Sequence, residues 1–144
     1  MPFELSARID ASPDRVFAVL TDLRQAKDWL PSVQKIDEVS PGSFGTGTSW
    51  RETRQAGKRI FQSTIRVTEY KPASTLSLVV DGKGMTGQLS FRLAPKDGGT
   101  DVHYVAEMKG KGLMRLMTGT INRMMAAEDA DLLDRLRDQV RRSR

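Results

Sequence analysis

The feature that most constrains this chain is a long series of strands followed by a single helical segment. Between residues 33 and 109, short turns separate six consecutive segments, and apolar and polar side chains alternate clearly in the last four of them. This alternation is typical of strands that bury one face, and strands joined by such short turns must pair antiparallel. From residue 113 onward, the apolar side chains follow a helical period instead. The chain therefore has to bury a large sheet against very little helix.

A seventh strand and two short helices precede this series. Residues 3–9 alternate between apolar and polar side chains, which predicts a strand with one buried face. Ser12 then suits the N-cap of a helix, and Pro13 suits its first turn. A second short helical piece is expected at residues 24–29, and it must end near Pro31.

The strand series and the C-terminal segment have predictable bounds. The apolar residues of the segment 33–39 stand three apart, which indicates a bulge or a position at the sheet edge. The C-terminal stripe predicts one continuous helix of about 30 residues, which at 1.5 Å per residue is about 45 Å long. The predicted strands of the series are residues 33–39, 46–55, 59–70, 75–81, 85–93 and 102–108.

The order of these elements predicts an α+β fold. A single amphipathic helix cannot cover seven flat strands, so the antiparallel sheet must curl around the long C-terminal helix. A curled sheet that grips a helix commonly leaves a cavity between the two. All 144 residues are expected to form one domain, 1–144, and a chain of this length buries roughly 70% of its extended surface on folding.

The composition excludes several kinds of site. The chain has no cysteine, so a disulfide framework, a thiolate nucleophile and a cysteine-ligated metal are impossible. Its one histidine, His103, excludes a multi-histidine metal site. His103 is also expected to point away from the helix, and the chain has no nucleophile-elbow motif. We therefore predict no metal, no cofactor and no hydrolase-type catalytic triad.

The net charge of +5 is concentrated at two places. Residues 51–59 and residues 141–144 each carry a local charge of +3, so the basic residues form two spots rather than a face. This pattern predicts no specific nucleic-acid partner and leaves weak attraction to anionic surfaces open. No apolar run approaches the ~20 residues of a membrane span, and the N-terminus has no apolar signal core, which predicts a cytoplasmic protein without integral membrane contact.

Three segments carry a resemblance to a known superfamily. Residues 3–17 (FELSARIDASPDRVF), 28–31 (DWLP) and 47–53 (GTSWRET) resemble the START-related polyketide cyclase/dehydrase and lipid-transport superfamily, often labelled SRPBCC. The similarity covers essentially the whole chain, and the first 31 residues are its most specific part. It implies a helix-grip fold around an apolar ligand cavity, without naming a ligand or a reaction.

Candidate lining residues follow from the inward faces of the predicted elements. Five of the seven methionines fall between residues 108 and 125, where they either fill the core or line an adaptable cavity. The candidate ligand-binding residues are Trp50, Phe61, Ile65, Leu78, Leu89, Phe91, Tyr104, Met108, Met117 and Met124.

Two polar residues are candidates for proton transfer or for hydrogen bonding to a ligand. Glu52 shares a strand face with Trp50 and Arg54, and this face points either into the cavity or to solvent at the sheet rim. Tyr104 should point inward, where its hydroxyl needs a hydrogen-bond partner. If the protein is an enzyme, Glu52 and Tyr104 are the candidate catalytic residues.

Three functions remain open at this point. The first is a carrier or sensor that binds a small hydrophobic molecule or lipid in the cavity. The second is a polyketide cyclase- or dehydratase-like enzyme, in which Glu52 and Tyr104 transfer a proton or hold a carbonyl. The third is a protein-interaction module, which would show an exposed apolar patch and a filled core. The sequence leaves the ligand, the pathway and the oligomeric state open.

Overall fold

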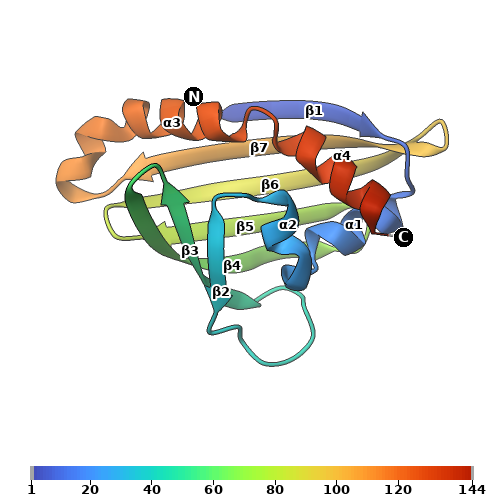
Figure 1. Ribbon diagram of the computed structural model, residues 1–144, viewed down its shortest axis with the longest axis horizontal. Coiled ribbons are helices and arrows are strands. Elements are labelled where there is room, and N and C mark those ends of the chain that lie inside the picture. Colours follow the sequence, from blue (N-terminus) through green and yellow to red (C-terminus); the bar gives the residue numbers. More distant parts are fainter. Residues whose placement is uncertain (1, 144) are drawn as a thin grey trace.

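The computed structural model describes residues 2–143. Its strands form one seven-stranded antiparallel sheet in the order β1-β7-β6-β5-β4-β3-β2 (Figure 1). The strands are β1 (Phe3–Ile9), β2 (Val33–Asp37), β3 (Ser49–Ala56), β4 (Arg59–Lys71), β5 (Thr75–Gly82), β6 (Met85–Lys96) and β7 (Gly99–Gly110). The helices are α1 (Pro13–Leu20), the 3-10 turn η1 (Leu23–Gln25), α2 (Ala26–Trp29), the 3-10 turn η2 (Gly112–Met117), α3 (Thr118–Asp129) and α4 (Leu132–Arg142).

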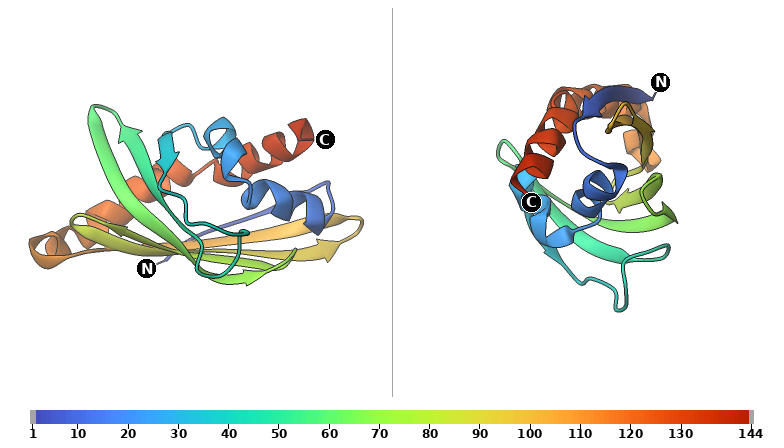
Figure 2. Two further views of the ribbon diagram at one scale, coloured as in Figure 1. Left: turned by 90° about the horizontal axis from the view of Figure 1, so that it is seen from below. Right: turned by 90° about the vertical axis from the view of Figure 1, so that its right-hand side faces the viewer.

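The sheet is curled but not closed. Strand β1 pairs with β7, so the first strand lies beside the last, and β2 forms the opposite edge. Helices α1, α2 and α4 lie on the concave side of the sheet, while β3 and β4 rise out of its plane (Figure 2). This arrangement confirms the predicted α+β fold, with a curled antiparallel sheet and two short helical elements between the first two strands.

The first helix begins as its sequence predicts. The Ser12 side chain accepts a hydrogen bond from the Arg15 backbone at 3.3 Å, and Pro13 occupies the first helical turn. The second helical piece, η1 with α2, ends at Trp29, two residues before Pro31.

Strand β2 has both features that the spacing of its apolar residues indicated. It lies at the edge of the sheet, and its register against β3 shifts between Val33 and Lys35. It ends at Asp37 rather than at residue 39 as predicted, because Glu38 adopts a φ of 51°, in the left-handed region. The chain therefore turns away from the sheet two residues early.

The C-terminal helical segment departs from the prediction of one continuous helix. It consists of η2, α3 and α4, with a break at residues 130 and 131. Helix α3 packs against β7, whereas α4 packs against α1, α2 and β1. A straight helix could not make both sets of contacts, so the change of direction at the break is what lets the segment cover the sheet and close against α1 and α2.

Only the second half of the predicted apolar stripe is buried. In α4, Leu132, Leu136 and Val140 are all buried in the core. In η2, by contrast, Leu113 and Leu116 are 94% and 92% exposed. The pairing of β1 with β7 reaches only Ala106, so η2 extends past the end of β1.

The core fills one end of the space between sheet and helices. Phe17 of α1 and Leu136 of α4 are buried there, together with Leu93 and Val102, which pair across β6 and β7. These side chains close that end of the molecule. The remaining space between the sheet and the helices, toward the opposite end, forms a cavity.

Candidate ligand-binding cavity

A cavity of about 850 Å³ lies between the concave face of the sheet and the helices. Strands β3 to β7 form one wall, and α2, α3 and the start of α4 form the other. Most of the lining is apolar. Ligand pockets of about 300–1,000 Å³ enclose drug-sized molecules, so this cavity has room for one.

Nine of the ten candidate residues line this cavity. Eight of them lie on strands, where every second side chain points to the concave face, and Met124 lies on α3. One row runs across the sheet through pairs of facing residues, from Trp50 to Ile65, Val80, Gly87 and Met108. The candidates that line the cavity are Trp50, Phe61, Ile65, Leu78, Leu89, Phe91, Tyr104, Met108 and Met124.

Met117 is the exception, and the prediction that it lines the cavity is wrong. It is exposed and does not border the cavity. The prediction assumed 3.6 residues per turn from residue 113 onward, but residues 112–117 form a 3-10 turn with three residues per turn. Met114 and Met125 line the cavity instead, along with Met85 from β6.

A buried ion pair stands in the cavity wall on β3. The Arg54 Nε donates to Oε2 of Glu52 at 2.7 Å, and the Trp50 Nε1 donates to Oε1 at 3.4 Å. A further Arg54 nitrogen donates to the Ser32 hydroxyl at 3.1 Å. Glu52 is only 6% exposed, so Trp50 and Glu52 face the cavity and not the solvent.

The environment of Arg54 keeps its guanidinium charged. Burial disfavours the guanidinium charge, but the neighbouring Glu52 carboxylate more than offsets this, and the pKa of Arg54 is raised above its usual value. The wall therefore presents a fixed positive and a fixed negative group side by side.

A second polar pair joins the sheet to the helix break. The Tyr104 hydroxyl of β7 donates to Oδ2 of Asp129, the last residue of α3, at 3.2 Å. Burial raises the pKa of Asp129 above its usual value, and burial together with the Asp129 charge raises that of Tyr104 well above 10.0. Tyr104 therefore remains a neutral hydrogen-bond donor in the cavity wall.

The two pairs belong to one polar region. All four residues line the same cavity, and the positive charge of Arg54 lowers the pKa values of Asp129 and Tyr104 against the larger effect of burial. We call Glu52, Arg54, Tyr104 and Asp129 the polar cluster. It combines donors and acceptors in an otherwise apolar cavity, which is the arrangement that fixes the orientation of a ligand.

Sequence reasoning missed Asp129, although a signal was present. Ile121, Met125 and Asp129 follow one another at intervals of four, so the aspartate continues an inward-facing helical row. A single acid in an apolar helical row indicates a buried carboxyl with a partner on the facing element. Here that partner is Tyr104.

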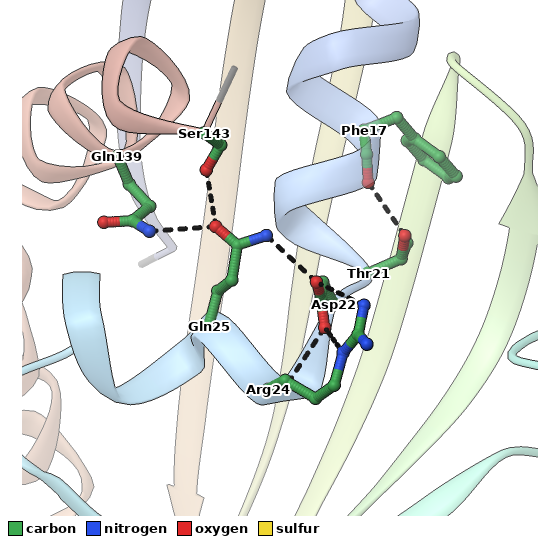
Figure 3. A network of polar contacts seen from close by, with 7 residues as sticks. All are labelled: Phe17, Thr21, Asp22, Arg24, Gln25, Gln139 and Ser143. Atoms are coloured by element: carbon green, nitrogen blue, oxygen red, sulfur yellow. Dashed lines mark hydrogen bonds and ion pairs between the residues drawn. The ribbon is translucent and has the colours of Figure 1, made fainter.

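A hydrogen-bond network fixes the wall formed by η1 and α2. The Gln25 side-chain oxygen accepts from Gln139 Nε2 at 2.9 Å and from the Ser143 hydroxyl, while its nitrogen donates to Asp22 at 2.9 Å (Figure 3). Arg24 also binds Asp22, and these bonds outweigh burial and hold the pKa of Asp22 at about 2. The network ties this wall of the cavity to the end of α4.

His103 takes no part in the cavity. It bonds Ser6 and Glu4 on the neighbouring strand β1, on the outer face of the sheet, as its position in the alternation predicts. Within residues 2–143, no three acidic or histidine side chains gather in a way that could hold a metal ion. Among the helices in this part of the chain, none has the length and apolar character needed to cross a bilayer.

The sequence of this chain matches a known protein family. The sequence model of the family described as polyketide cyclase/dehydrase and lipid transport matches residues 2–141. The chain belongs to this family. A comparison with curated protein sequences finds no match. The family and its fold fit a protein that either binds a hydrophobic ligand or acts as a cyclase.

Solved structures with the family's helix-grip fold are similar over nearly the whole chain. TTHA0849 from Thermus thermophilus is 19% identical over 97% of both chains, with a TM-score of 0.80. The Zhui aromatase/cyclase from Streptomyces sp. R1128 is 14% identical over 99% of this chain and 94% of its own, with a TM-score of 0.79. Ara h 8.0201 is 16% identical over 97% of both chains, with a TM-score of 0.71. At these identities the similarity shows the fold alone.

Proposed function

We propose that this protein binds a small hydrophobic molecule or lipid in its cavity, as a carrier or sensor. The observation that carries the proposal is the apolar cavity of about 850 Å³ between the sheet and the helices. The side chains that line a volume of this size do not pack against one another across it as they do in an ordinary core. A ligand that fills it would supply the missing contacts.

The polar cluster narrows the chemistry of that ligand. Arg54 and Tyr104 bring donors to the cavity wall, and Glu52 and Asp129 bring acceptors. A ligand that buries these groups without bonding them would incur a desolvation cost. The favoured ligand is therefore an apolar body with a carbonyl or hydroxyl group that meets the cluster.

Displacement of a neutral naphthylamine fluorophore tests the proposal. Leu89→Trp places an indole in the cavity from β6, and it should abolish uptake of the fluorophore by filling the space. Gln88→Trp is the matched control, because it places the same side chain on the outer face of the same strand. Fluorophore uptake that survives Leu89→Trp, or that never occurs, contradicts the proposal.

Native mass spectrometry of the protein purified from cells provides the second test. The expected result is an added mass in the range of a small lipid or aromatic compound, which organic extraction removes. The Leu89→Trp protein, purified in parallel, should lack this mass. An unliganded mass for the unmodified chain, together with no fluorophore uptake, would mean that the cavity does not hold an apolar ligand.

A second candidate is a cyclase- or dehydratase-like enzyme. It is favoured by one observation, that Glu52 and Tyr104 line the same cavity and are both buried. The Glu52 carboxylate would take a proton from a carbon beside a carbonyl, and Arg54 and Tyr104 would hold the resulting enolate oxygen. The apolar walls would hold the polyketide substrate in a folded conformation in which its reacting carbons meet.

The enzyme candidate is tested with a poly-β-ketone analogue as substrate. Turnover should be lost in Glu52→Gln and in Tyr104→Phe, while both variants still take up the neutral fluorophore. Turnover that is absent from the unmodified protein, or unaffected by both variants, rejects this candidate. A module devoted only to protein docking needs no such cavity, and the cavity therefore favours the two ligand-based functions.

A further inference from the structure

Large apolar side chains face solvent at one end of the molecule, beside the cavity. Leu113 and Leu116 in η2 are almost wholly exposed, and Ile60 at the start of β4 is 64% exposed. Phe61 and Met117 are also exposed. Single exposed apolar residues are ordinary on protein surfaces, but a group of them in one place marks an interaction site.

These side chains belong to two elements, η2 and the β3–β4 hairpin, which lie with the β5–β6 turn at one end of the molecule. The cavity is bordered by Ile60 and Phe61 from the β3–β4 hairpin, by Lys83 from the β5–β6 turn and by Met114 from η2. Figure 2 (left) shows both hairpins and the start of the C-terminal helical segment at the same end. We call these three elements, residues 57–61, 82–84 and 111–117, the rim.

The chain around the rim is strongly basic. The rim itself contains Lys58, Arg59, Lys83, Lys111 and Arg115 and no acid. At the third element, Asp81 is paired with Lys111, and Lys83 adds a further positive charge. The rim therefore combines exposed apolar side chains with an excess of positive charge.

The part of the rim formed by η2 is held in place. The Lys111 backbone donates to the Gly84 carbonyl at 2.9 Å, and the Gly110 backbone donates to the Thr118 hydroxyl at 2.9 Å. A Cβ on Gly110 would lie 1.8 Å from the Met114 carbonyl oxygen, so only glycine permits this close turn. The leucines are presented to solvent on a fixed turn.

We propose that the rim docks onto the surface of an anionic lipid bilayer, with Leu113, Leu116 and Ile60 entering the boundary of the acyl chains. Apolar side chains flanked by lysine and arginine are what such a surface binds, because the apolar groups leave water while the cations meet the lipid headgroups. A second copy of this chain fits less well, since an interface between two rims would bring like charges together.

The proposal goes beyond ligand binding and stands without it. Docking would place the cavity mouth against the lipid, whatever the cavity contains. Leu89→Trp should therefore abolish fluorophore uptake without reducing docking. Fluorophore uptake tests the ligand-binding proposal and vesicle binding tests the docking proposal, so one can fail without the other.

Sedimentation with vesicles tests the apolar contribution. The unmodified protein should sediment with vesicles of phosphatidylcholine and phosphatidylglycerol, and much less with vesicles of phosphatidylcholine alone. Leu113→Ser/Leu116→Ser should reduce the affinity by about tenfold or more, because two leucines no longer leave water. The fold should survive, since both side chains are exposed. Val39→Ser is the control. It changes an exposed apolar residue that follows the C-terminal end of β2, away from the rim, and it should have no effect.

A charge variant tests the electrostatic contribution. Lys58→Gln/Arg115→Gln should reduce binding by about tenfold or more, because both residues are exposed in the rim, and added salt should reduce binding by the unmodified protein as well. The matched control is Lys27→Gln/Arg92→Gln, which removes the same charge from exposed positions away from the rim and should cause a smaller loss.

Three results would overturn the proposal. The first is no binding to either kind of vesicle. The second is binding that neither pair of rim substitutions weakens. The third is a dimer at the concentrations of the assay that Leu113→Ser/Leu116→Ser converts to a monomer, which would make the rim an interface between copies of this chain.

Discussion

The side-chain amide of Asn122 in α3 bonds both backbone groups of Met108 in β7. Its oxygen accepts from the Met108 nitrogen at 2.9 Å, and its nitrogen donates to the Met108 carbonyl at 2.7 Å. Strand β1 pairs with β7 only as far as Ala106, so Asn122 satisfies the next pair of backbone groups at that edge. This contact fixes α3 beside the cavity lining residue Met108.

Replacing Asn122 by alanine should therefore loosen α3. The substitution leaves the Met108 N–H and C=O without partners, which should lower the free energy of unfolding by about 1–3 kcal/mol. Hydrogen exchange at the Met108 amide should accelerate. Arg123→Ala, at an exposed position on the same helix, should cost less than about 0.5 kcal/mol. Equal effects of the two variants in chemical denaturation would show that the Asn122 bonds do not anchor α3.

The strands and their inward faces could be predicted because the signal is local. The alternation that places Ile65 or Leu78 on the concave face depends only on a period of two, and the short turns leave no choice of pairing. This is why the eight candidate residues on strands line the cavity. Whether Trp50 and Glu52 point inward could not be decided locally, because it depends on the partner that Arg54 supplies.

The C-terminal segment could be predicted less well because its period is not constant. A 3-10 turn at the start shifts the phase of the helix, and the break after Asp129 changes its direction. The 3-10 turn follows the part of β7 that extends beyond the Phe3–Ala106 pair, and the break follows Asp129, which bonds the Tyr104 hydroxyl; neither neighbour can be identified from the local sequence. Extrapolating a single period along this segment assigned Met117 to the cavity and passed over Asp129.

The Glu52–Arg54 pair should show strong coupling in a double-mutant cycle. Arg54→Met leaves the Glu52 carboxylate buried without its partner and should cost about 3 kcal/mol, the lower end for a buried pair because the Arg54 side chain is 32% exposed. The double variant Glu52→Gln/Arg54→Met should be less destabilised than Arg54→Met alone. Additive costs in urea denaturation would mean that the two charges do not depend on each other.

Asp129 should make the protein less stable as the pH rises. Its pKa in the folded state lies above the usual 3.8, so between these two values the folded state binds more protons than the unfolded state. The free energy of unfolding should therefore fall as the pH rises from 3.8 through the folded pKa. Asp129→Asn keeps an acceptor for Tyr104 and should flatten this decline. Unchanged pH dependence of unfolding in that variant would contradict the buried position of the carboxyl.

Asp22 should have the opposite effect at lower pH. Its bonds to Arg24 and Gln25 hold its folded-state pKa at about 2, below the usual 3.8, so its stabilisation is present above 3.8 and is lost as the pH falls through 2. Thermal melting should show a Tm that rises over this range in the unmodified protein. Asp22→Asn should remove the rise while leaving the decline caused by Asp129 in place. A variant that retains the rise would assign it to another carboxylate.

Gly87 should control how much of the cavity is available to a ligand. It faces Met108 across β6 and β7, and a Cβ at this position would lie 2.0 Å from the Met108 sulfur. Gly87→Ala must therefore displace the Met108 side chain, and the open space that can receive it is the cavity. We expect a weaker affinity for the neutral fluorophore and a destabilisation of about 1–3 kcal/mol from overpacking. Gly45→Ala, where a Cβ would meet no atom within 4 Å, is the matched control and should leave fluorophore affinity unchanged. If Gly87→Ala lowers stability but leaves the affinity intact, Met108 moves elsewhere and does not border the bound ligand.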